Sequence, residues 1–343
     1  MGEYPLMSAL KRDADAVDAT VAVLTYNGDQ YIAQILDALV AQDFDGDFEV
    51  LVIDSGSSDR TLEIVRSHPN VRLHEISNAD FGHGKTRNLA AQLARGEYIA
   101  FLTHDAIPAS PAWLRELLAP LRDEALGVVA VMGKQIPRPG CFPLLKYEIQ
   151  GVFAGFGPDF GTTVFYNDGF AQDQGLLDAL GFYSDVNSAT RRDFLLNTIP
   201  YRDVRYAEDM LFGQDVIAAG YRKAYAPRGA VIHSNDLTLA EYRKRIFDET
   251  VGLRQIGKQI PPLTRAAQLK LTTRGILADT ARLIRDRELS RKRRAYWLVM
   301  NPRYHIAKWR SYRASTLVDL SDAEAIRAQS LEHSRTPGTA PSS

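Results

Sequence analysis

The sequence predicts an α/β protein with a mainly parallel sheet, helices on both of its faces, and a helical extension at the C-terminus. From Val21 onward, short apolar runs alternate with segments whose apolar residues recur at helical spacing. Such alternation gives parallel strands that are covered on both sides. Polar residues directly follow several of the runs, and the stretch 263–314 is basic and helical in pattern, which predicts the extension.

The first half of the chain carries the expected strands and helices in alternating order. Tyr31–Gln42 has apolar residues at positions 32, 35, 36, 39 and 40, so one helical face is apolar. Ser58 or Asp59 can cap a second helix, and Ser110-Pro111 is typical of a helix start. A further helix is expected over 85–94, and the expected strands are 21–25, 48–54, 71–76, 98–103 and 127–132.

The second half is less regular. Residues 133–206 are rich in Gly, Pro, Phe and Tyr without a sustained period, which predicts irregular substrate-facing structure. A helix is expected over 208–219, then a short strand over 230–233 and a helix from about residue 239. Four segments follow from this: an N-terminal extension (1–18), the α/β domain (19–250), a basic helical extension (251–320) and a disordered tail (321–343).

The composition is that of an ordinary folded protein. The chain has 343 residues, 45% hydrophobic and 24% charged, which excludes fibrous and low-complexity classes. No uncharged apolar run approaches the roughly 18 residues of a membrane-spanning helix, and the first residues lack the apolar core of a signal peptide. The single cysteine, Cys141, can form no internal disulfide. We therefore expect a cytoplasmic protein.

Polar residues follow three of the expected strands at the edge where parallel sheets bind ligands. They are Thr25-Tyr26-Asn27, Asp54-Ser55-Gly56 and Thr103-His104-Asp105. Asp54 can accept a hydrogen bond from a pyrimidine N–H, and a Gly56 turn lets backbone approach a nucleotide closely. A plain loop with a helix-capping carboxylate is the alternative.

Two further groups of charged residues lie at expected helix starts. Lys85 and Arg87 lie at an expected helix start, where unpaired N–H groups already favour anions. Arg87 is expected to bind a diphosphate or a base edge, unless this is only a solvated helix end. Glu208 and Asp209 open a later helix and either act on a substrate or complement the helix N-terminus.

Five motifs, in order, resemble glycosyltransferase family 2 over roughly residues 20–235. They are VLTYNGDQYIAQILDAL, FEVLVIDSGSSDRT, NADFGHGKTRNLAA, FLTHDA and YAEDMLFGQDVIAAGYR. The resemblance implies the GT-A fold, whose sheet is Rossmann-like, and an inverting transfer from a nucleotide-sugar donor. It implies donor contacts from the residues after the strands and from Lys85 and Arg87. It also implies that Asp209, beside Glu208, is the base that deprotonates the acceptor hydroxyl.

The metal motif departs from the family pattern. FLTHDA stands where the family usually has Asp-X-Asp, so Thr103 replaces the first carboxylate and only Asp105 remains. One carboxylate suffices for Mg²⁺ or Mn²⁺ when phosphates and waters fill the other positions. His104 is expected to pack or to point outward. His233 is either a further ligand, as in some GT-A enzymes, or a structural histidine.

Three features are similar to rhamnosyltransferases that use dTDP-L-rhamnose. They are the THDA variant, FYSDVNSATRRDF and HSNDLTLAEYRKRIFDE. The similarity implies that Asp185 and Asn187 shape the sugar and acceptor pockets, and that the acceptor is a glycan, often linked to a polyprenyl diphosphate. Other nucleotide sugars remain open as donors. The rival classes are a sugar nucleotidyltransferase, which needs a Gly-rich basic loop that TYNGDQ does not supply, and a non-catalytic nucleotide-sugar or glycan-binding module.

The charge is distributed unevenly. Residues 251–314 carry a net charge of +13, so the rest of the chain carries −14. Basic residues beside Tyr296, Trp297 and Trp309 suit a helix on the anionic inner leaflet of the plasma membrane. A nucleic-acid partner is not expected, although the composition also suits RNA. A basic cap packed on the acidic body, or a contact in a homo-oligomer, is the alternative.

Overall fold

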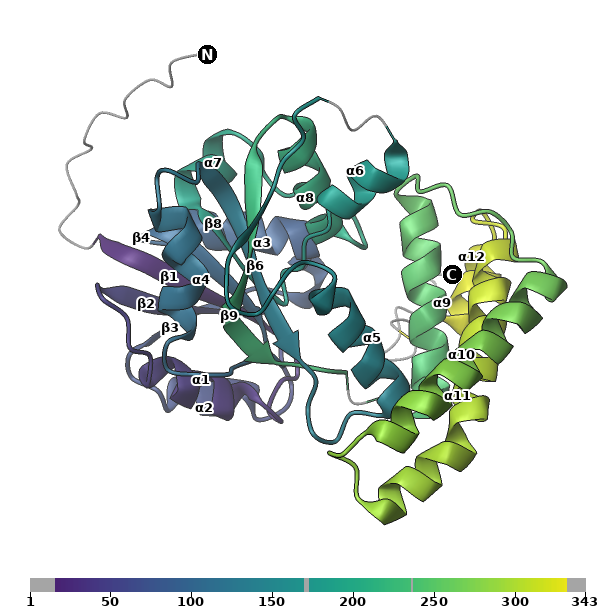
Figure 1. The fold of residues 1–343 in the computed structure, drawn as a ribbon. Helices are drawn as coiled ribbons and strands as arrows, with labels where there is room; N and C mark the ends of the chain where they lie inside the picture. Colours follow the sequence, from purple (N-terminus) through teal and green to yellow (C-terminus); the bar gives the residue numbers. More distant parts are fainter. Residues whose placement is uncertain (1–15, 170–172, 236, 332–343) are drawn as a thin grey trace, which may run out of the picture.

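The computed structural model describes residues 16–169, 173–235 and 237–331. It confirms the expected fold class: one large sheet carries helices on both faces, and further helices lie beside it at the C-terminal end of the chain (Figure 1).

The described residues form a nine-stranded sheet in the order β3-β2-β1-β4-β8-β6-β9-β5, with β7 paired to β9. β1 pairs in parallel with β2 and β4, whereas β8 is antiparallel to both β4 and β6. The strands are β1 (Val17–Thr25), β2 (Phe48–Asp54), β3 (Val71–Glu75), β4 (Gly96–Thr103), β5 (Ile107–Pro108), β6 (Val128–Ile136), β7 (Thr163–Phe165), β8 (Asn187–Arg191) and β9 (Arg222–Ile232).

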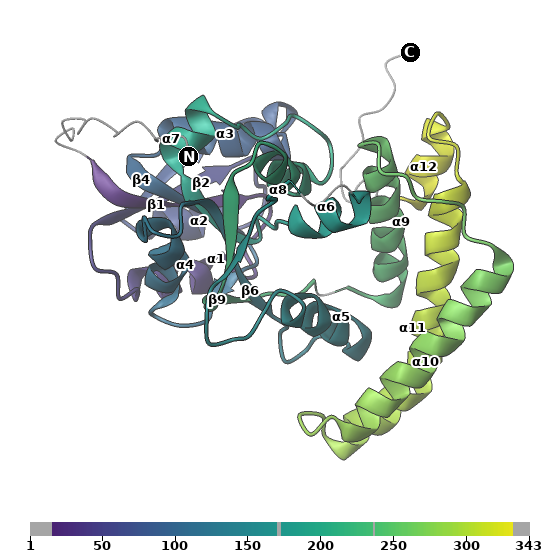
Figure 2. The same ribbon diagram turned by 45° about the horizontal axis from the view of Figure 1, so that its top comes forward.

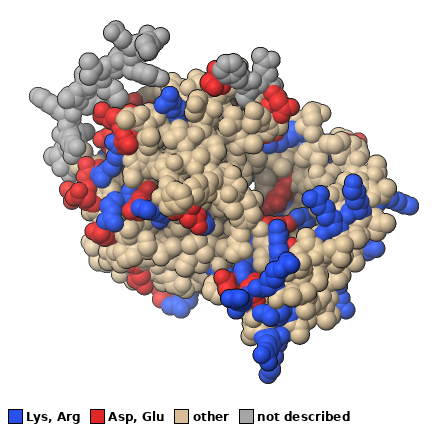
Figure 3. Space-filling view, viewed as in Figure 1, with Lys and Arg blue, Asp and Glu red and all other residues tan. Residues whose placement is uncertain are grey.

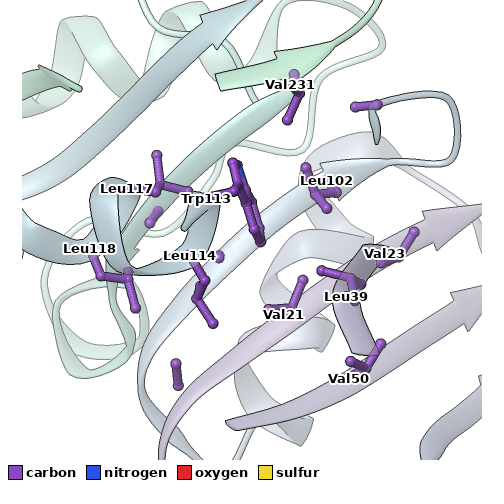
Figure 4. Close-up of a cluster of buried hydrophobic side chains, with 14 of the residues drawn as sticks. Val21, Val23, Leu39, Val50, Leu102, Trp113, Leu114, Leu117, Leu118 and Val231 are labelled. Carbon is purple, nitrogen blue, oxygen red and sulfur yellow. The ribbon is translucent and has the colours of Figure 1, made fainter. Parts of the chain in front are cut away.

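Two apolar layers hold helices against the sheet, because successive strand side chains point to opposite faces. Val21 and Val23 lie in the layer shared with α1 (Ile32–Val40), α2 (Thr61–Arg66) and α4 (Trp113–Arg122). Figure 4 shows Trp113 and its α4 neighbours against these strands. Ala22 lies in the other layer, with α3 (His83–Leu93), α7 (Arg192–Asn197) and α8 (Glu208–Ala218).

The segment expected to be irregular contains more regular structure than its pattern indicates. It holds α5 (Pro143–Ala154), α6 (Gln174–Leu180), α7 and the two strands β7 and β8. β8 has the sequence NSATR, and Asn187, Ser188 and Thr190 are buried in the middle of the sheet. A strand with so few apolar residues gives no hydrophobic signal, so the prediction was wrong here. β9 begins at Arg222 rather than at residue 230 as expected, because the charged residues Arg222 and Lys223 at its start do not give an apolar strand pattern.

The basic extension (251–320) contains the last turn of α9 (Leu239–Gln255) and a hairpin of α10 (Arg265–Arg285) and α11 (Arg291–Leu317), so the expected boundary at residue 250 falls inside α9. The hairpin packs on α9 and α5, on the side away from the sheet (Figure 2). Apolar contacts join Phe142 and Leu144 to Tyr242 and Tyr304, and Lys146 pairs with Asp286 at 2.8 Å. The hairpin therefore packs on the body of the protein, as the alternative interpretation of the basic segment predicts.

The chain ends of the described part differ from expectation. Residues 17 and 18 belong to β1 rather than to an N-terminal extension. Helix α12 (Ala323–Gln329) lies within the segment expected to be disordered, and Ile326 packs near Phe247 and Val251 of α9. Residues 1–15 and 332–343 lie outside the described residues. None of the described helices combines the length and the hydropathy needed to cross a bilayer.

Candidate active site

The loops after β1, β2 and β4 meet at one edge of the sheet and hold each other by hydrogen bonds. Oδ1 of Asn27, which lies in the left-handed region at φ 49°, accepts from the Ser58 N–H at 2.8 Å. The Asn27 N–H donates to Ser57 Oγ at 2.8 Å, and the Tyr26 N–H faces His104 Nδ1 at 3.3 Å. The sequence prediction that these three loops lie together is confirmed.

Asp54 is fully buried and its carboxylate is occupied within its own turn. Oδ1 accepts from the Gly56 and Ser57 N–H groups at 3.0 and 2.8 Å, and Oδ2 accepts from the Thr25 and Ser57 hydroxyls at 2.8 and 2.6 Å. Gly56 has φ +85°, a conformation that favours glycine. A carboxylate offers about four lone-pair sites. The geometry thus favours a turn-holding role for Asp54 over the expected contact with a base.

Asp105 and His233 form the centre of the predicted metal motif. Oδ2 of Asp105 lies 3.3 Å from His233 Nε2, and the Thr103 hydroxyl donates to Asp105 Oδ1 at 2.7 Å. His233 Nδ1 faces Gln135 Oε1 at 2.9 Å, which fixes the ring. Burial acts to raise the pKa of Asp105, but the neighbouring His233 imidazole and the Thr103 hydroxyl outweigh it and lower that pKa. Asp105 therefore stays ionised over the whole physiological pH range.

The donor set fits a divalent cation only in part. One carboxylate and one imidazole nitrogen lie side by side, and no group of three or more His, Cys, Asp or Glu in the described residues could hold a metal. A Mg²⁺ or Mn²⁺ site here must take its remaining ligands from a donor diphosphate and water. Asp105 and His233 suit such a shared site.

Arg87 does not present its guanidinium to solvent as a diphosphate ligand would. Its side chain is 6% exposed; Nε lies 2.9 Å from Asp185 Oδ2, and Nη1 donates to Glu208 Oε1. Burial opposes the charge, but the two carboxylates outweigh it and raise the pKa of Arg87. The expected diphosphate role is at odds with this geometry. Lys85 is exposed, with Asp80 at 3.9 Å.

Asp185 is similarly enclosed, so the expected pocket role does not fit it. Its side chain has no exposed surface, and Oδ1 accepts from the Ser188 and Tyr201 hydroxyls at 2.6 and 2.8 Å. Burial raises its pKa despite the charge of Arg87. With Arg87, Asp185 forms the buried support beneath the Glu-Asp pair.

Asn187 is also a structural residue. Its Oδ1 accepts from the Trp113 indole at 3.0 Å, and its Nδ2 donates to the Gly229 carbonyl at 2.7 Å. Only glycine fits at 133, because a Cβ there would lie 2.2 Å from Asn187 Nδ2. Asn187 therefore joins α4 to β9 and leaves no group for a sugar.

Asp209 opens α8 next to Glu208 and, unlike Glu208, keeps part of its surface exposed. Its Oδ2 accepts from the Asp185 N–H at 3.3 Å, and Oδ1 from the Met210 N–H at 2.8 Å. Burial, followed by the charges of Glu208 and Asp185, raises the pKa of Asp209 to about 7. The preceding Ala207 has φ 60°, a strained conformation of the kind that clusters at functional sites.

A chain of contacts joins the Asp105 motif to Asp209. His233 contacts Gln135, the Gln135 amide donates to Ser184 Oγ at 3.1 Å, and the next residue, Asp185, donates to Asp209. The two motifs are therefore linked by one continuous path of contacts. In Figure 3 a hollow with acidic atoms at its floor lies between the body and the C-terminal helices.

The sequence prediction missed three residues that build this site. Gln135 joins the two motifs, and Tyr201 donates to Asp185. Arg138 donates to the carbonyls of Asp105 and Ser234, and its guanidinium carbon lies 3.9 Å from the Tyr31 ring centre. All three lie in or beside the segment without periodicity, where no pattern marks them.

Comparison with known proteins decides the family. The model of glycosyl transferase family 2 matches residues 20–196. The chain belongs to this family. It is therefore a glycosyltransferase. The Asp105 motif lies inside the matched residues, whereas the Glu-Asp pair at 208 and 209 follows them in the chain.

Two relatives of this family-2 chain are O-antigen chain rhamnosyltransferases. RfbN of Salmonella typhimurium strain LT2 is 32% identical over 68% of this chain and 71% of its own length. WbaN of Salmonella anatum is 32% identical over 59% of this chain and 62% of its own length. The rhamnosyltransferase-like resemblance is thereby confirmed.

Solved structures of similar fold support the GT-A assignment of this family-2 chain. The mannosyltransferase PcManGT from Pyrobaculum calidifontis, solved with GDP-Man and Mn²⁺, has a TM-score of 0.53 at 20% identity and covers 90% of each chain. S. aureus TarS 1–349, solved with UDP-GlcNAc, has a TM-score of 0.50 at 18% identity, covering 91% of this chain and 79% of that one. At these identities the likeness concerns the fold alone.

Proposed function

We propose that this protein transfers L-rhamnose from dTDP-β-L-rhamnose to a hydroxyl of a glycan acceptor, with inversion, in the synthesis of a surface polysaccharide. The observation that carries the reaction class is Asp209, a partly exposed carboxylate at a helix start whose pKa is raised to about 7. A base with a pKa near the working pH is efficient in proton transfer. The donor sugar rests on the two rhamnosyltransferase relatives.

Each motif has a part in the proposed mechanism. Asp209 takes the proton of the acceptor hydroxyl as that oxygen attacks the anomeric carbon from the face opposite the diphosphate. The Asp185 N–H and the start of α8 hold the Asp209 carboxylate in place. Glu208, paired with Arg87, keeps a negative charge beside Asp209 and so raises its basicity. The β donor gives an α-linked product in one displacement.

The loops after β1, β2 and β4 form the proposed donor site. Tyr26, Asn27, Thr103 and His104 would face the nucleotide, and Lys85 would approach the diphosphate from the start of α3. Thr25, also expected at the donor, is buried and its hydroxyl donates to Asp54, so it supports the loop from below. Asp105 and His233 would hold Mg²⁺ or Mn²⁺ together with the diphosphate. A divalent cation there would neutralise the charge that grows on the leaving diphosphate.

We assign catalysis to residues 19–250, with 251–320 as an accessory unit. The acceptor is proposed to be a glycan on a polyprenyl diphosphate at the inner face of the plasma membrane. A homo-oligomer contact through the basic segment stays a prediction from the sequence.

A second candidate is transfer from a UDP- or GDP-linked sugar, since structures of this fold were solved with UDP-GlcNAc and with GDP-Man. Turnover and thermal shift with dTDP-β-L-rhamnose, UDP-GlcNAc and GDP-Man, each with and without Mn²⁺, decide between them. We expect a tight ligand at about 100 times its Kd to add about 2.7 kcal/mol of stability. Stabilisation and turnover with a UDP- or GDP-sugar but not with dTDP-rhamnose would contradict the proposed donor.

A further inference from the structure

The α10–α11 hairpin leaves apolar side chains in solvent on its outer side. Leu269, Leu277 and Ile284 of α10 are 69%, 66% and 59% exposed. Their spacing of eight and seven residues places them on one stripe of the helix. On α11, Val299 and Ile306 are 68% and 40% exposed and lie seven residues apart.

This stripe is not the side that packs on the rest of the protein. α10 uses Asp279 and Leu283 for its contacts with α11 and α5, and α11 uses Tyr304 and Ser311 for its contacts with α5 and α9. At 100° per residue, Val299 and Ile306 lie opposite the contacts of α11, and Leu277 and Ile284 lie at least about 100° from Asp279 and Leu283 on α10. Leu269 lies at the edge of this side, about 40° from Leu283. We call the exposed apolar residues of the two helices the outer face of the hairpin; Figure 2 shows the hairpin on the side of α9 away from the sheet.

Basic side chains border the same face. Lys270, Arg274 and Arg285 are exposed on α10, and Lys292, Arg303 and Arg310 are exposed on α11. Figure 3 shows Lys and Arg gathered over the C-terminal helices, whereas Asp and Glu are more frequent over the body. Tyr296, 56% exposed, adds an aromatic ring to the border.

We propose that the outer face of the α10–α11 hairpin docks on an anionic lipid leaflet. Apolar side chains flanked by Lys and Arg match the boundary between acyl chains and charged headgroups. Two copies docked face to face on this surface would instead bring two basic borders together. The inference deepens the proposed function, since its purpose rests on a lipid-linked acceptor.

The docking face is coupled to the site through packed elements. The hairpin packs on α9, and Gly252 of α9 lies against the ring of Tyr206, two residues before Glu208. A Cβ at 252 would come within 2.5 Å of that ring. A leaflet that holds the hairpin thus holds the catalytic helix at a fixed height above the membrane.

Sedimentation of the full chain with vesicles tests the proposal. The probes are phosphatidylcholine vesicles with and without phosphatidylglycerol, at low and high salt. We expect binding to the anionic vesicles that weakens with salt, and little binding to the neutral ones. The triple variant Lys270→Gln, Arg274→Gln, Arg285→Gln should lose about a hundredfold in affinity, since each basic residue contributes about fivefold.

A second variant set separates the apolar part. Leu269→Ser, Leu277→Ser and Ile284→Ser together should weaken binding at least tenfold, while Val40→Ser and Arg228→Gln, matched exposed positions on the body, should leave it unchanged. Absence of vesicle binding, equal binding to neutral vesicles, or binding that none of the hairpin variants reduces would overturn the proposal. So would self-association or RNA binding that the hairpin variants abolish in the absence of vesicle binding. No sugar donor is present, so these results stand apart from those on the transfer reaction.

Discussion

The main-chain N–H of Asp185 donates a hydrogen bond to Oδ2 of Asp209 at 3.3 Å, while the Asp185 carboxylate is turned inward to Arg87. One residue thus orients the proposed base with its backbone and raises the base's pKa with its buried charge. The buried guanidinium of Arg87 forms ion pairs with Asp185 and Glu208 and so offsets their negative charge. Three carboxylates thus lie close together, and of these Asp185 and Glu208 are buried while Asp209 is partly exposed.

The rate should depend on the ionisation of Asp209. Because its pKa is raised to about 7, the base form is scarce below that pH, and kcat/KM should rise as pH increases through about 7. Glu208→Gln removes a neighbouring negative charge, so the pKa of Asp209 should fall and the rising limb should move to lower pH by about one unit. Steady-state kcat/KM between pH 5 and 9 measures this, with Glu63→Gln on the exposed surface as the control. A limb that stays in place or moves to higher pH would contradict the assignment.

Arg87 should matter more for stability than for donor binding. Arg87→Ala leaves Asp185 and Glu208 buried without their partner, which should cost about 3–5 kcal/mol in the free energy of unfolding. Lys85→Ala, at an exposed position two residues earlier in the same helix, should change the free energy of unfolding by no more than about 0.5 kcal/mol. Urea denaturation provides both values. Unchanged stability of Arg87→Ala together with a large loss of nucleotide affinity would restore the diphosphate role expected from the sequence.

Asp105 and His233 should be needed for metal-dependent donor binding. We expect Mn²⁺ to increase the thermal stabilisation by dTDP, and Asp105→Asn to abolish the increase because the site loses its one carboxylate. His233→Ala should reduce the increase, whereas His68→Ala, on another part of the surface, should not. Thermal shift with dTDP alone and with dTDP plus Mn²⁺ distinguishes these results. An increase that survives both site substitutions would place the metal elsewhere.

The regular half of the fold follows from the sequence because its strands are apolar and its helices amphipathic. The apolar runs 21–25 and 48–54, for example, are predicted as strands from the sequence alone and are strands in the structure. β8 does not, because Asn187, Ser188 and Thr190 are buried through hydrogen bonds rather than apolar contacts. Its place between β4 and β6 depends on partners distant in the chain, which a local pattern cannot reveal.

The sequence identified residues that lie at or near the candidate site, but it assigned the wrong role to several of them. The motifs of Asp105 and Asp209 do lie in one network of contacts. Arg87, Asp185 and Asn187 are the residue types that bind phosphates and sugars, and the sequence predicted them as ligands. The structure turns all three inward, because buried ion pairs and strand junctions need the same chemistry. Burial alone separates the two uses, and burial is decided by the tertiary fold.

Single-turnover transfer by Asp209→Asn tests the central claim most directly. With dTDP-β-L-rhamnose bound, the wild-type chain should form an α-linked product, and the variant should be slower by about 10²–10⁴-fold at unchanged donor affinity. Asp215→Asn on the same helix, whose carboxylate pairs with Arg202, should retain the wild-type rate. Transfer by Asp209→Asn at the wild-type rate would show that another group takes the acceptor proton, and the account of this site would be wrong.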